Sequence, residues 1–246
     1  MREGSRASAK ITKVGPLYGH LLRRDTPLAI GETYHVFNRG AHKSNLFKDE
    51  DDYRRFLLLM FLANRETSLN MRDLTSKYKG RTFAEMFMFE EVAKSLVDVL
   101  AYSLMPNHFH IVLQQKAEEG ISSYMKKVAT AYSMYFNLKY SHSGTLFQGR
   151  YKSSHIAEEP YYRWIFSYVH LNPIALREPK WEEQGILDPE TVRSFLRGYP
   201  YSSYFDHRVG RRPESKILAT ENLPDFLREQ DDLKDMLATF TKVRPL

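Results

Sequence analysis

The sequence predicts an α+β fold in which helices cover an antiparallel sheet, and three observations lead to this prediction. Four segments have the apolar, β-branched character of strands, at residues 33–38, 97–104, 108–114 and 146–156. Helical periodicity separates the first strand from the second and the third from the fourth. Only three residues join the two middle strands, which indicates a hairpin. The order strand, helix, strand, strand, helix, strand is that of a ferredoxin-like βαββαβ core, an antiparallel sheet with two helices on one face.

The N-terminal part supplies an arm, the first strand and the first helix. Residues 1–29 are rich in Gly, Ser, Arg and Lys and have no periodicity, so we expect a flexible basic arm. The first strand, TYHVFN, ends at the turn residues Arg39 and Gly40. Acidic residues 49–52 open a helix, because apolar residues then recur at spacings of three and four. Residues 65–95 are polar and irregular, and we interpret them as an insertion with a helix from Phe83.

The remaining elements are a hairpin, a long helix, a strand and a further helix. The turn Met105-Pro106-Asn107 joins the hairpin strands, and the long helix spans 121–140. The extended segment 146–156 is followed by a helix from Pro160 to about Asn172, since the residue before Pro173 is disfavoured in the helical region. Residues 181–246 form a C-terminal extension with short helices, which leaves one domain over 30–180.

Composition excludes several classes of protein. The 246 residues are 42% hydrophobic and 13% aromatic, so the chain buries a core and is neither a disordered tail nor collagen-like. The absence of cysteine excludes disulfides, thiolate zinc sites and cysteine nucleophiles. The longest apolar run, 56–63, is too short to cross a bilayer, and the opening residues do not resemble a signal peptide, so we expect an intracellular protein. The net charge of +6 favours a polyanionic partner.

The string MPNHFHIVL at 105–113 carries the first chemical signal. Side chains alternate along a strand, so His108 and His110 point to one face and Phe109 to the other. Two imidazoles one pleat apart can hold a divalent ion, but only where other ligands converge; alone, such a pair is more often structural.

The helix before Pro173 carries the second signal. Tyr168 and Asn172 are four residues apart and therefore share one helical stripe. If this stripe docks beside the histidines, two imidazoles and an amide oxygen would hold a metal ion next to a phenol. Such a cation would help an otherwise weak tyrosine nucleophile attack a phosphodiester. These ligands suit Mg²⁺ or Mn²⁺ when a substrate phosphate is also present.

Five strings together resemble a known family. MPNHFHIVL looks like the HUH motif, and SYVHLNP looks like the tyrosine helix of the single-tyrosine HUH transposases. Within that superfamily, the chain resembles the REP-associated tyrosine transposases, bacterial relatives of insertion-sequence transposases. The supporting strings are YHVFNRG at 34–40, MPNHFHIVL at 105–113, GTLFQGRYKSS at 144–154, YVHLNP at 168–173 and YPYSSY at 199–204. They occur in the family's order and cover about residues 30–205.

The resemblance implies a role for each site residue. His108, His110 and Asn172 would bind the divalent metal, and Tyr168 would be the nucleophile that forms a 5′-phosphotyrosine link and releases a 3′-hydroxyl. Residues 30–180 would be the HUH catalytic domain, acting on single-stranded or hairpin DNA in DNA transposition and recombination, without a nucleotide cofactor or a membrane. The protein would be a bacterial cytoplasmic one associated with the nucleoid, as a monomer or a homodimer. Two alternatives remain: a domesticated DNA-hairpin binder that no longer cuts, and an HxH metal phosphodiesterase.

A basic stretch predicts the DNA surface. Between residues 121 and 154 there are five Lys and Arg residues, several aromatic residues and no Asp or Glu, a mixture suited to phosphate contacts and base stacking. Arg150 and Lys152 are expected to alternate on one strand face. The predicted DNA contacts are Asn38, Arg39, Lys126, Lys127, Arg150 and Lys152.

Overall fold

A computed structural model describes residues 28–67, 79–89, 91, 94–228 and 233–242. The predicted arm, apart from its last two residues, therefore lies outside the described part of the chain. The same holds for residues 68–78 of the predicted insertion, whereas the helix predicted from Phe83 is present as α3, Phe83–Phe89.

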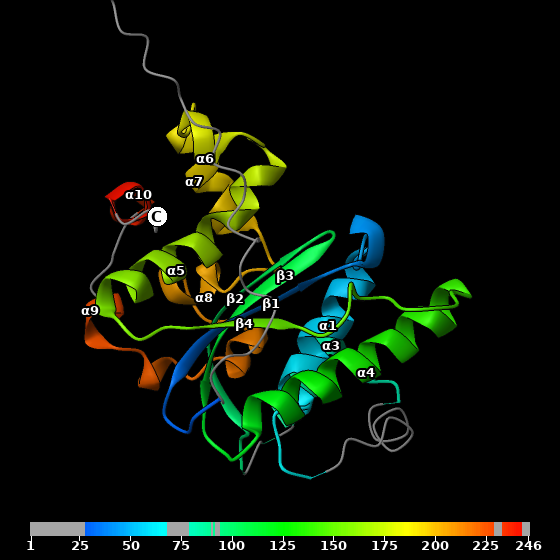
Figure 1. Cartoon of the computed structure of the whole chain (residues 1–246). Coiled ribbons are helices and arrows are strands. Elements are labelled where there is room, and N and C mark those ends of the chain that lie inside the picture. Colours follow the sequence, from blue (N-terminus) through cyan, green and yellow to red (C-terminus); the bar gives the residue numbers. More distant parts are fainter. Residues whose placement is uncertain (1–27, 68–78, 90, 92–93, 229–232, 243–246) are drawn as a thin grey trace, which may run out of the picture.

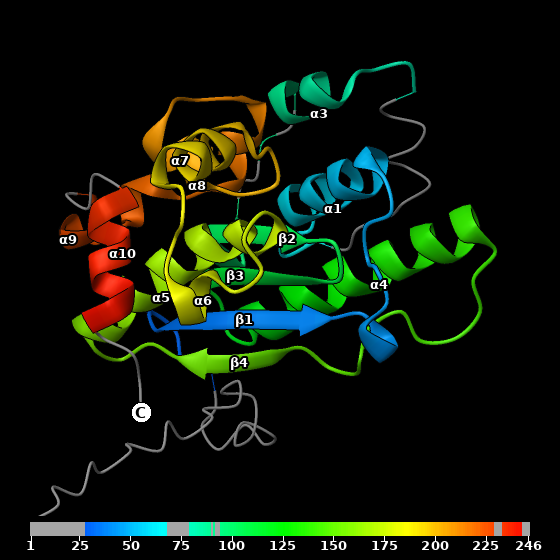
Figure 2. The ribbon, with the colours of Figure 1, turned by 90° about the horizontal axis from the view of Figure 1, so that it is seen from above.

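The core is one four-stranded antiparallel sheet (Figures 1 and 2). Its strands are β1 (Thr33–Arg39), β2 (Val97–Met105), β3 (His108–Gln115) and β4 (Lys152–His155), in the spatial order β2-β3-β1-β4. Met105 pairs with His108, so Pro106 and Asn107 form the tight turn of the predicted hairpin. This order and the antiparallel pairing confirm the ferredoxin-like fold.

Two helices cover one face of the sheet, as predicted. They are α1 (Glu50–Leu62) and α4 (Gly120–Tyr140), and α1 begins where the Asp49 side chain accepts a hydrogen bond from the Asp52 backbone N–H. Their apolar sides pack against alternate strand residues such as Val36 and Phe109, which are buried in the larger of two hydrophobic clusters. Phe109 therefore points away from the face on which His108 and His110 lie.

The opposite face is covered by α5 (Glu159–Leu171), with Pro160 in its first turn. The helix ends at Leu171, close to the predicted end, but Asn172 does not leave the helical region, which we expected because Pro173 follows. Asn172 keeps right-handed helical angles, its backbone N–H donates to the Tyr168 carbonyl, and the chain continues as the 3-10 helix η2 (Asn172–Leu176). Tyr168 and Asn172 therefore stay on one helical stripe.

The extended segment predicted over 146–156 is shorter than expected. Only Lys152–His155 pair with β1 as β4, while Phe147 forms an isolated bridge with Gly40. Gly144 and Gly149 have φ angles of 102° and 108°, which turn the backbone out of an extended path. Arg150 thus precedes the strand and does not alternate with Lys152 within it.

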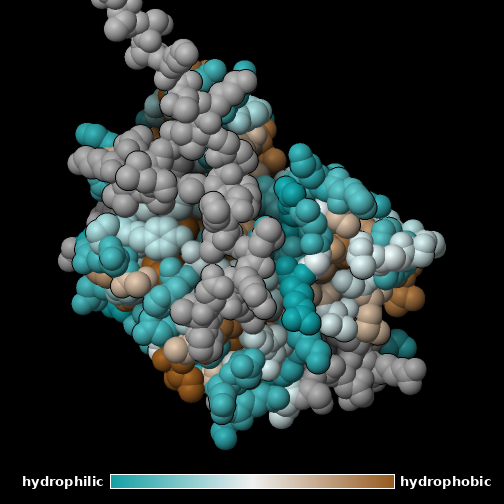
Figure 3. Space-filling model, in the orientation of Figure 1, coloured by the Kyte–Doolittle hydropathy of each residue, from teal (hydrophilic) through white to brown (hydrophobic). Residues whose placement is uncertain are grey.

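The C-terminal extension packs along β2 and against α5. Its α-helices are α6 (Trp181–Gln184), α7 (Pro189–Gly198), α8 (Tyr204–Arg208), α9 (Asp225–Arg228) and α10 (Leu233–Lys242). The extension also contains the 3-10 helices η3 (Pro213–Ile217) and η4 (Thr220–Asn222), whereas η1 (Ala41–Lys43) follows β1. On the face seen in Figure 3, most of the described surface is hydrophilic or intermediate, and its hydrophobic patches are small and separate.

The string YPYSSY attaches this extension to the sheet. The Leu104 N–H donates to the Tyr201 carbonyl, and the Ser203 N–H donates to the Tyr102 carbonyl, each at 2.9 Å. The Ser203 hydroxyl also lies 2.8 Å from Nε2 of the buried His170. Through this contact, the helix that carries Tyr168 is tied to the β2 edge.

Candidate active site

Adjacent strands and one helix bring the predicted site residues together. His110 comes from β3, and Tyr168 comes from α5 on the same face of the sheet. The ring centre of Tyr168 lies 5.2 Å from that of His110, edge to face at 81°. Trp164, one turn earlier on α5, stacks on the Tyr168 ring with centroids 5.3 Å apart and an interplanar angle of 3°. The tyrosine ring is therefore held between an aromatic neighbour and the histidines.

The two ring nitrogens of His110 have different surroundings. Its Nδ1 lies 2.8 Å from Nε2 of His35 on β1, and the two rings stack with centroids 5.0 Å apart. Its Nε2 is buried and has no hydrogen-bond partner among the described residues. A buried polar atom without a partner is costly, so a ligand that accepts the nitrogen lone pair would stabilise this arrangement.

His108 and Asn172 meet beside it. His108 Nε2 lies 3.1 Å from Asn172 Oδ1, and His108 Nδ1 lies 2.7 Å from Asn107 Oδ1. Both ring nitrogens thus face amide oxygens, whereas a neutral imidazole carries only one N–H. A cation between Nε2 and the Asn172 oxygen would satisfy both lone pairs.

Burial keeps these imidazoles neutral. It lowers the pKa of His35 to about 3 and is also the largest cause of the lowered pKa of His108, which the charge of Arg39 lowers further and the Asn172 contact opposes. The pKa of His110 lies well below its usual value through burial and the neighbouring His35 and His108. Neutral imidazole is the form that binds metals.

The donor set fits a divalent cation. It comprises two imidazole nitrogens and one amide oxygen, with the orphaned His110 Nε2 among them. The described residues contain no cluster of three or more His, Cys, Asp or Glu arranged to hold a metal. A set with few ligands leaves coordination positions for substrate oxygens.

The structure also includes a residue that sequence reasoning did not assign to the site. From the sequence, His35 could join a site, but a histidine on an apolar strand is more often satisfied in the core; it is buried, and its partner is His110. The string YHVFNRG already held it, and the antiparallel register that pairs Phe37 with His110 was the missing information.

The predicted DNA contacts are divided between the two faces. Arg39 pairs with His108 and Lys152 pairs with Phe37, so both lie on the histidine face. The Asn38 amide donates to the Gly149 carbonyl at 3.0 Å, Arg39 bonds Gln148, and Arg150 is exposed just before β4. These four residues gather around the end of β1.

Lys126 and Lys127 lie on α4, over the opposite face. Lys126 is exposed. The Lys127 ammonium donates to the carbonyls of Arg65 at 2.5 Å and Thr67 at 2.8 Å, which ties α4 to the loop after α1. The structure does not bring these two lysines to the tyrosine.

Comparison with known proteins finds a match to one family model. Residues 59–172 match the model of the family described as IS200-like transposases. This segment holds the hairpin, the two hairpin histidines, α4 and the tyrosine helix, so the match covers the elements that carry the predicted site residues. The resemblance to insertion-sequence transposases found in the sequence is confirmed by this match.

Structural comparison gives eight similar chains, among them a REP-associated tyrosine transposase bound to a REP hairpin. The similarity to this transposase has a TM-score of 0.47 at 13% identity and covers 75% of this chain and 84% of the other. No curated protein sequence matches the chain. No helix among the described residues has the length and apolar character needed to span a membrane.

Proposed function

We propose that this protein cuts and rejoins single-stranded DNA at or beside a hairpin, with Tyr168 as the nucleophile. The observation that carries the proposal is the Tyr168 ring against His110, whose buried Nε2 has no partner among the described residues. The match to a transposase family model supports a DNA substrate. His108, His110 and Asn172 would hold Mg²⁺ or Mn²⁺.

Each step of the reaction forms one phosphorus–oxygen ester bond and breaks another. The Tyr168 oxygen attacks the phosphorus and loses its proton, the bond from phosphorus to the 3′ oxygen breaks, and that oxygen leaves as a hydroxyl. In the reverse step a 3′-hydroxyl attacks the phosphotyrosine and releases Tyr168. The bound cation would polarise a non-bridging phosphate oxygen. No nucleotide cofactor is needed, because the phosphotyrosine bond stores the energy of the broken one.

The chain's own residues position the reacting groups. Trp164 stacking fixes the ring plane of Tyr168, and the Asn172 N–H bond to the Tyr168 carbonyl keeps both side chains on one stripe. We propose Arg39 and Lys152, on the same face, as phosphate contacts. Because one chain supplies all of these groups, the proposal needs no second subunit. A chromosomal substrate would place the protein at the bacterial nucleoid.

Adduct formation tests the proposal. The protein is incubated with a labelled DNA hairpin carrying single-stranded flanks, with Mn²⁺ or Mg²⁺, and covalent adducts are resolved on a denaturing gel. Tyr168→Phe is expected to lose the adduct at least 1,000-fold and to keep its DNA affinity. Tyr161→Phe, on the same helix with its hydroxyl near Ser154, is the matched control and keeps the adduct.

The other outcomes separate the rival functions. A free 5′-phosphate product without an adduct would indicate a metal phosphodiesterase. Hairpin binding by the wild-type protein with no cleavage under either metal would indicate a DNA binder that has lost the reaction. Either result contradicts the proposed function.

A further inference from the structure

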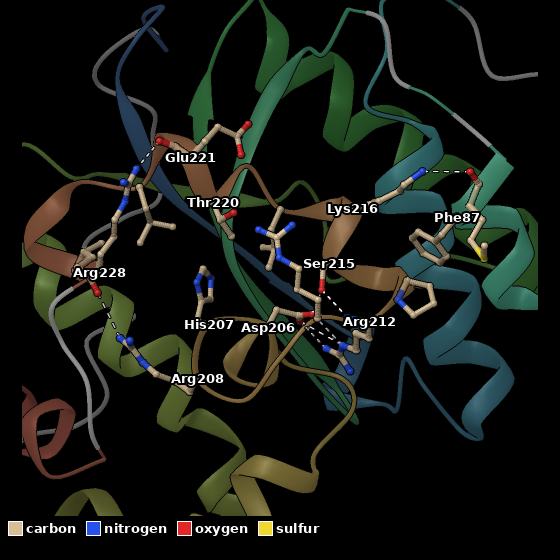
Figure 4. A pocket seen from close by; sticks show the side chains of 16 residues that line it. Phe87, Asp206, His207, Arg208, Arg212, Ser215, Lys216, Thr220, Glu221 and Arg228 are labelled. Atoms are coloured by element: carbon tan, nitrogen blue, oxygen red, sulfur yellow. Dashed lines mark hydrogen bonds and ion pairs between the residues drawn. The ribbon is translucent and has the colours of Figure 1, made fainter.

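A second site lies away from the tyrosine, at the β2 edge of the sheet. It is a pocket of about 760 Å³ between α3, α8 and the segment that contains η3, η4 and α9 (Figure 4). The C-terminal extension supplies most of its wall, and Leu218 of that wall forms a parallel bridge with Val99 of β2. None of the predicted DNA contacts lines it.

The wall of this pocket is strongly basic. Five cationic side chains line it against two carboxylates, a local excess of 5 − 2 = +3. One carboxylate, Asp206, accepts from Arg212 at 2.8 Å and from Ser215 at 2.5 Å, so it is neutralised within the wall. The cations are Arg208, Arg211, Arg212, Lys216 and Arg228.

The cations are spread along the pocket. Lys216 and Arg228 lie at opposite sides of it in Figure 4, where Lys216 donates to the Met88 carbonyl and Arg228 to the Glu221 carbonyl. A single small anion needs donors that converge on one point, whereas a row of cations fits successive phosphates of a polyanion.

The pocket and the tyrosine site are connected by β2. In the pocket, His207 donates to the Leu100 carbonyl at 2.9 Å, and five residues further along, at the end of the strand, Met105 pairs with His108. Five residues of strand span about 17 Å at about 3.4 Å each, which is the length of about five base-pair steps. His207 also packs on His170 of α5, so it belongs to the tyrosine face.

We propose that this pocket binds the sugar-phosphate backbone of a DNA duplex, the stem of a hairpin whose single-stranded flank lies at Tyr168. The proposal rests on the proposed function for the identity of the polyanion. The site would position the flank through contacts that carry no sequence information.

A charge-reversal pair tests the pocket. Arg211 and Lys216 are exposed members of its wall, and Lys94 and Lys234 are exposed lysines outside it. The variant R211E/K216E and the control K94E/K234E change the net charge equally. Affinity is measured by fluorescence anisotropy for a DNA hairpin with its flank and for the flank alone, between about 50 and 200 mM salt, the range over which phosphate contacts change affinity steeply.

The pocket variant is expected to bind the hairpin at least tenfold more weakly. The slope of log affinity against log salt concentration should become shallower by about 2, since each lost phosphate contact removes about 0.9 from it. It should bind the flank alone, and form an adduct with it, as the wild type does. The milder R211Q/K216Q should shift hairpin affinity in the same direction by less, and circular dichroism confirms that each variant folds.

The proposal is overturned if R211E/K216E binds the hairpin with unchanged affinity and salt slope. It is also overturned if K94E/K234E loses as much hairpin affinity, or if R211E/K216E loses as much affinity for the flank alone. The proposed cleavage function is tested separately, by whether the wild-type protein forms a covalent adduct with DNA. A wild type that forms no adduct, together with a pocket variant that loses hairpin affinity, would contradict the function and support the pocket.

Discussion

At the scale of single residues, the contact between His35 and His110 decides which His110 nitrogen keeps a free lone pair. Where His110 Nδ1 donates to His35 Nε2, 2.8 Å away, the free lone pair is on His110 Nε2, which is buried and has no hydrogen-bond partner among the described residues. A neighbour that fixes the tautomer and ring orientation of a metal ligand commonly changes metal affinity or activity 10- to 100-fold. His35 is therefore a positioning residue in this account.

Replacing His35 separates positioning from simple packing. His35→Phe keeps a ring beside Phe37 but removes the hydrogen bond, and we expect Mn²⁺ affinity, measured by calorimetry, to fall about 10- to 100-fold. His35→Gln retains a polar partner and should recover part of that loss. If both variants fold and bind Mn²⁺ as tightly as the wild type, His35 has no positioning role.

Spacing alone predicted part of this site. Strand alternation placed His108 and His110 on one face, and the interval of four placed Asn172 below Tyr168. The approach of His35 depends on the register between β1 and β3 and on ring directions, which no local pattern contains. The order of elements was predictable because hydrophobic periodicity depends only on residues that are close in the sequence. The cross-strand contacts were not predictable because register depends on how strands far apart in the sequence align.

At the scale of elements, the α1–α4 junction depends on a buried carboxylate. Asp52 is fully buried, and the Lys139 ammonium lies 2.9 Å from its Oδ1 and 2.7 Å from Asp49 Oδ1. The hydroxyls of Tyr135 and Tyr140 also donate to Asp52. Lys139 thus belongs to the packing of two helices, although its acid-free neighbourhood in the sequence indicated DNA binding.

Removing the Lys139 charge should therefore destabilise the fold and leave DNA affinity unchanged. Lys139→Met leaves Asp52 partly uncompensated, and we expect the free energy of unfolding to fall by about 1–3 kcal/mol, less than for a fully buried pair because Lys139 is partly exposed. Urea denaturation measures this, with the exposed Lys126→Met as the control. Unchanged stability combined with weaker DNA binding would return Lys139 to the DNA surface.

At the scale of the whole molecule, the basic surface does not coincide with the basic stretch of the sequence. Two of the five cations between residues 121 and 154, Lys127 and Lys139, are engaged in packing on the far face of the sheet. The basic pocket draws its cations from residues 208–228, where acidic residues are interspersed and no net charge run stands out. Folding, through ion pairs such as that of Arg212 with Asp206, decides which charges are presented.

Buried histidines should also make stability depend on pH. Burial lowers the pKa of His207 to about 4. The charge of Arg208 also lowers this pKa, whereas the hydrogen bond to the Leu100 carbonyl and the charge of Asp206 raise it. The buried ring of His170 packs against the His207 ring. The unfolded chain takes up this proton below pH 6.5 and the folded chain only near pH 4, so stability is lost as the pH falls between these values. This histidine alone should remove about 2 kcal/mol between pH 7 and pH 5.

Urea denaturation at both pH values checks this expectation. The His207→Gln variant should lose about 2 kcal/mol less than the wild type between pH 7 and pH 5, whatever its stability at pH 7. Replacing the exposed His142 by Gln serves as the control. An identical pH dependence in the wild type and His207→Gln would show that His207 is not held neutral by the fold.

Mapping the linkage shows whether Tyr168 becomes covalently joined to DNA. The wild-type protein is reacted with single-stranded DNA and Mn²⁺, digested with nuclease and protease, and analysed by mass spectrometry. We predict one modified peptide, from α5, with a nucleotide 5′-phosphate on the Tyr168 oxygen. Attachment to any other residue, or cleaved DNA with no modified peptide, would contradict the account.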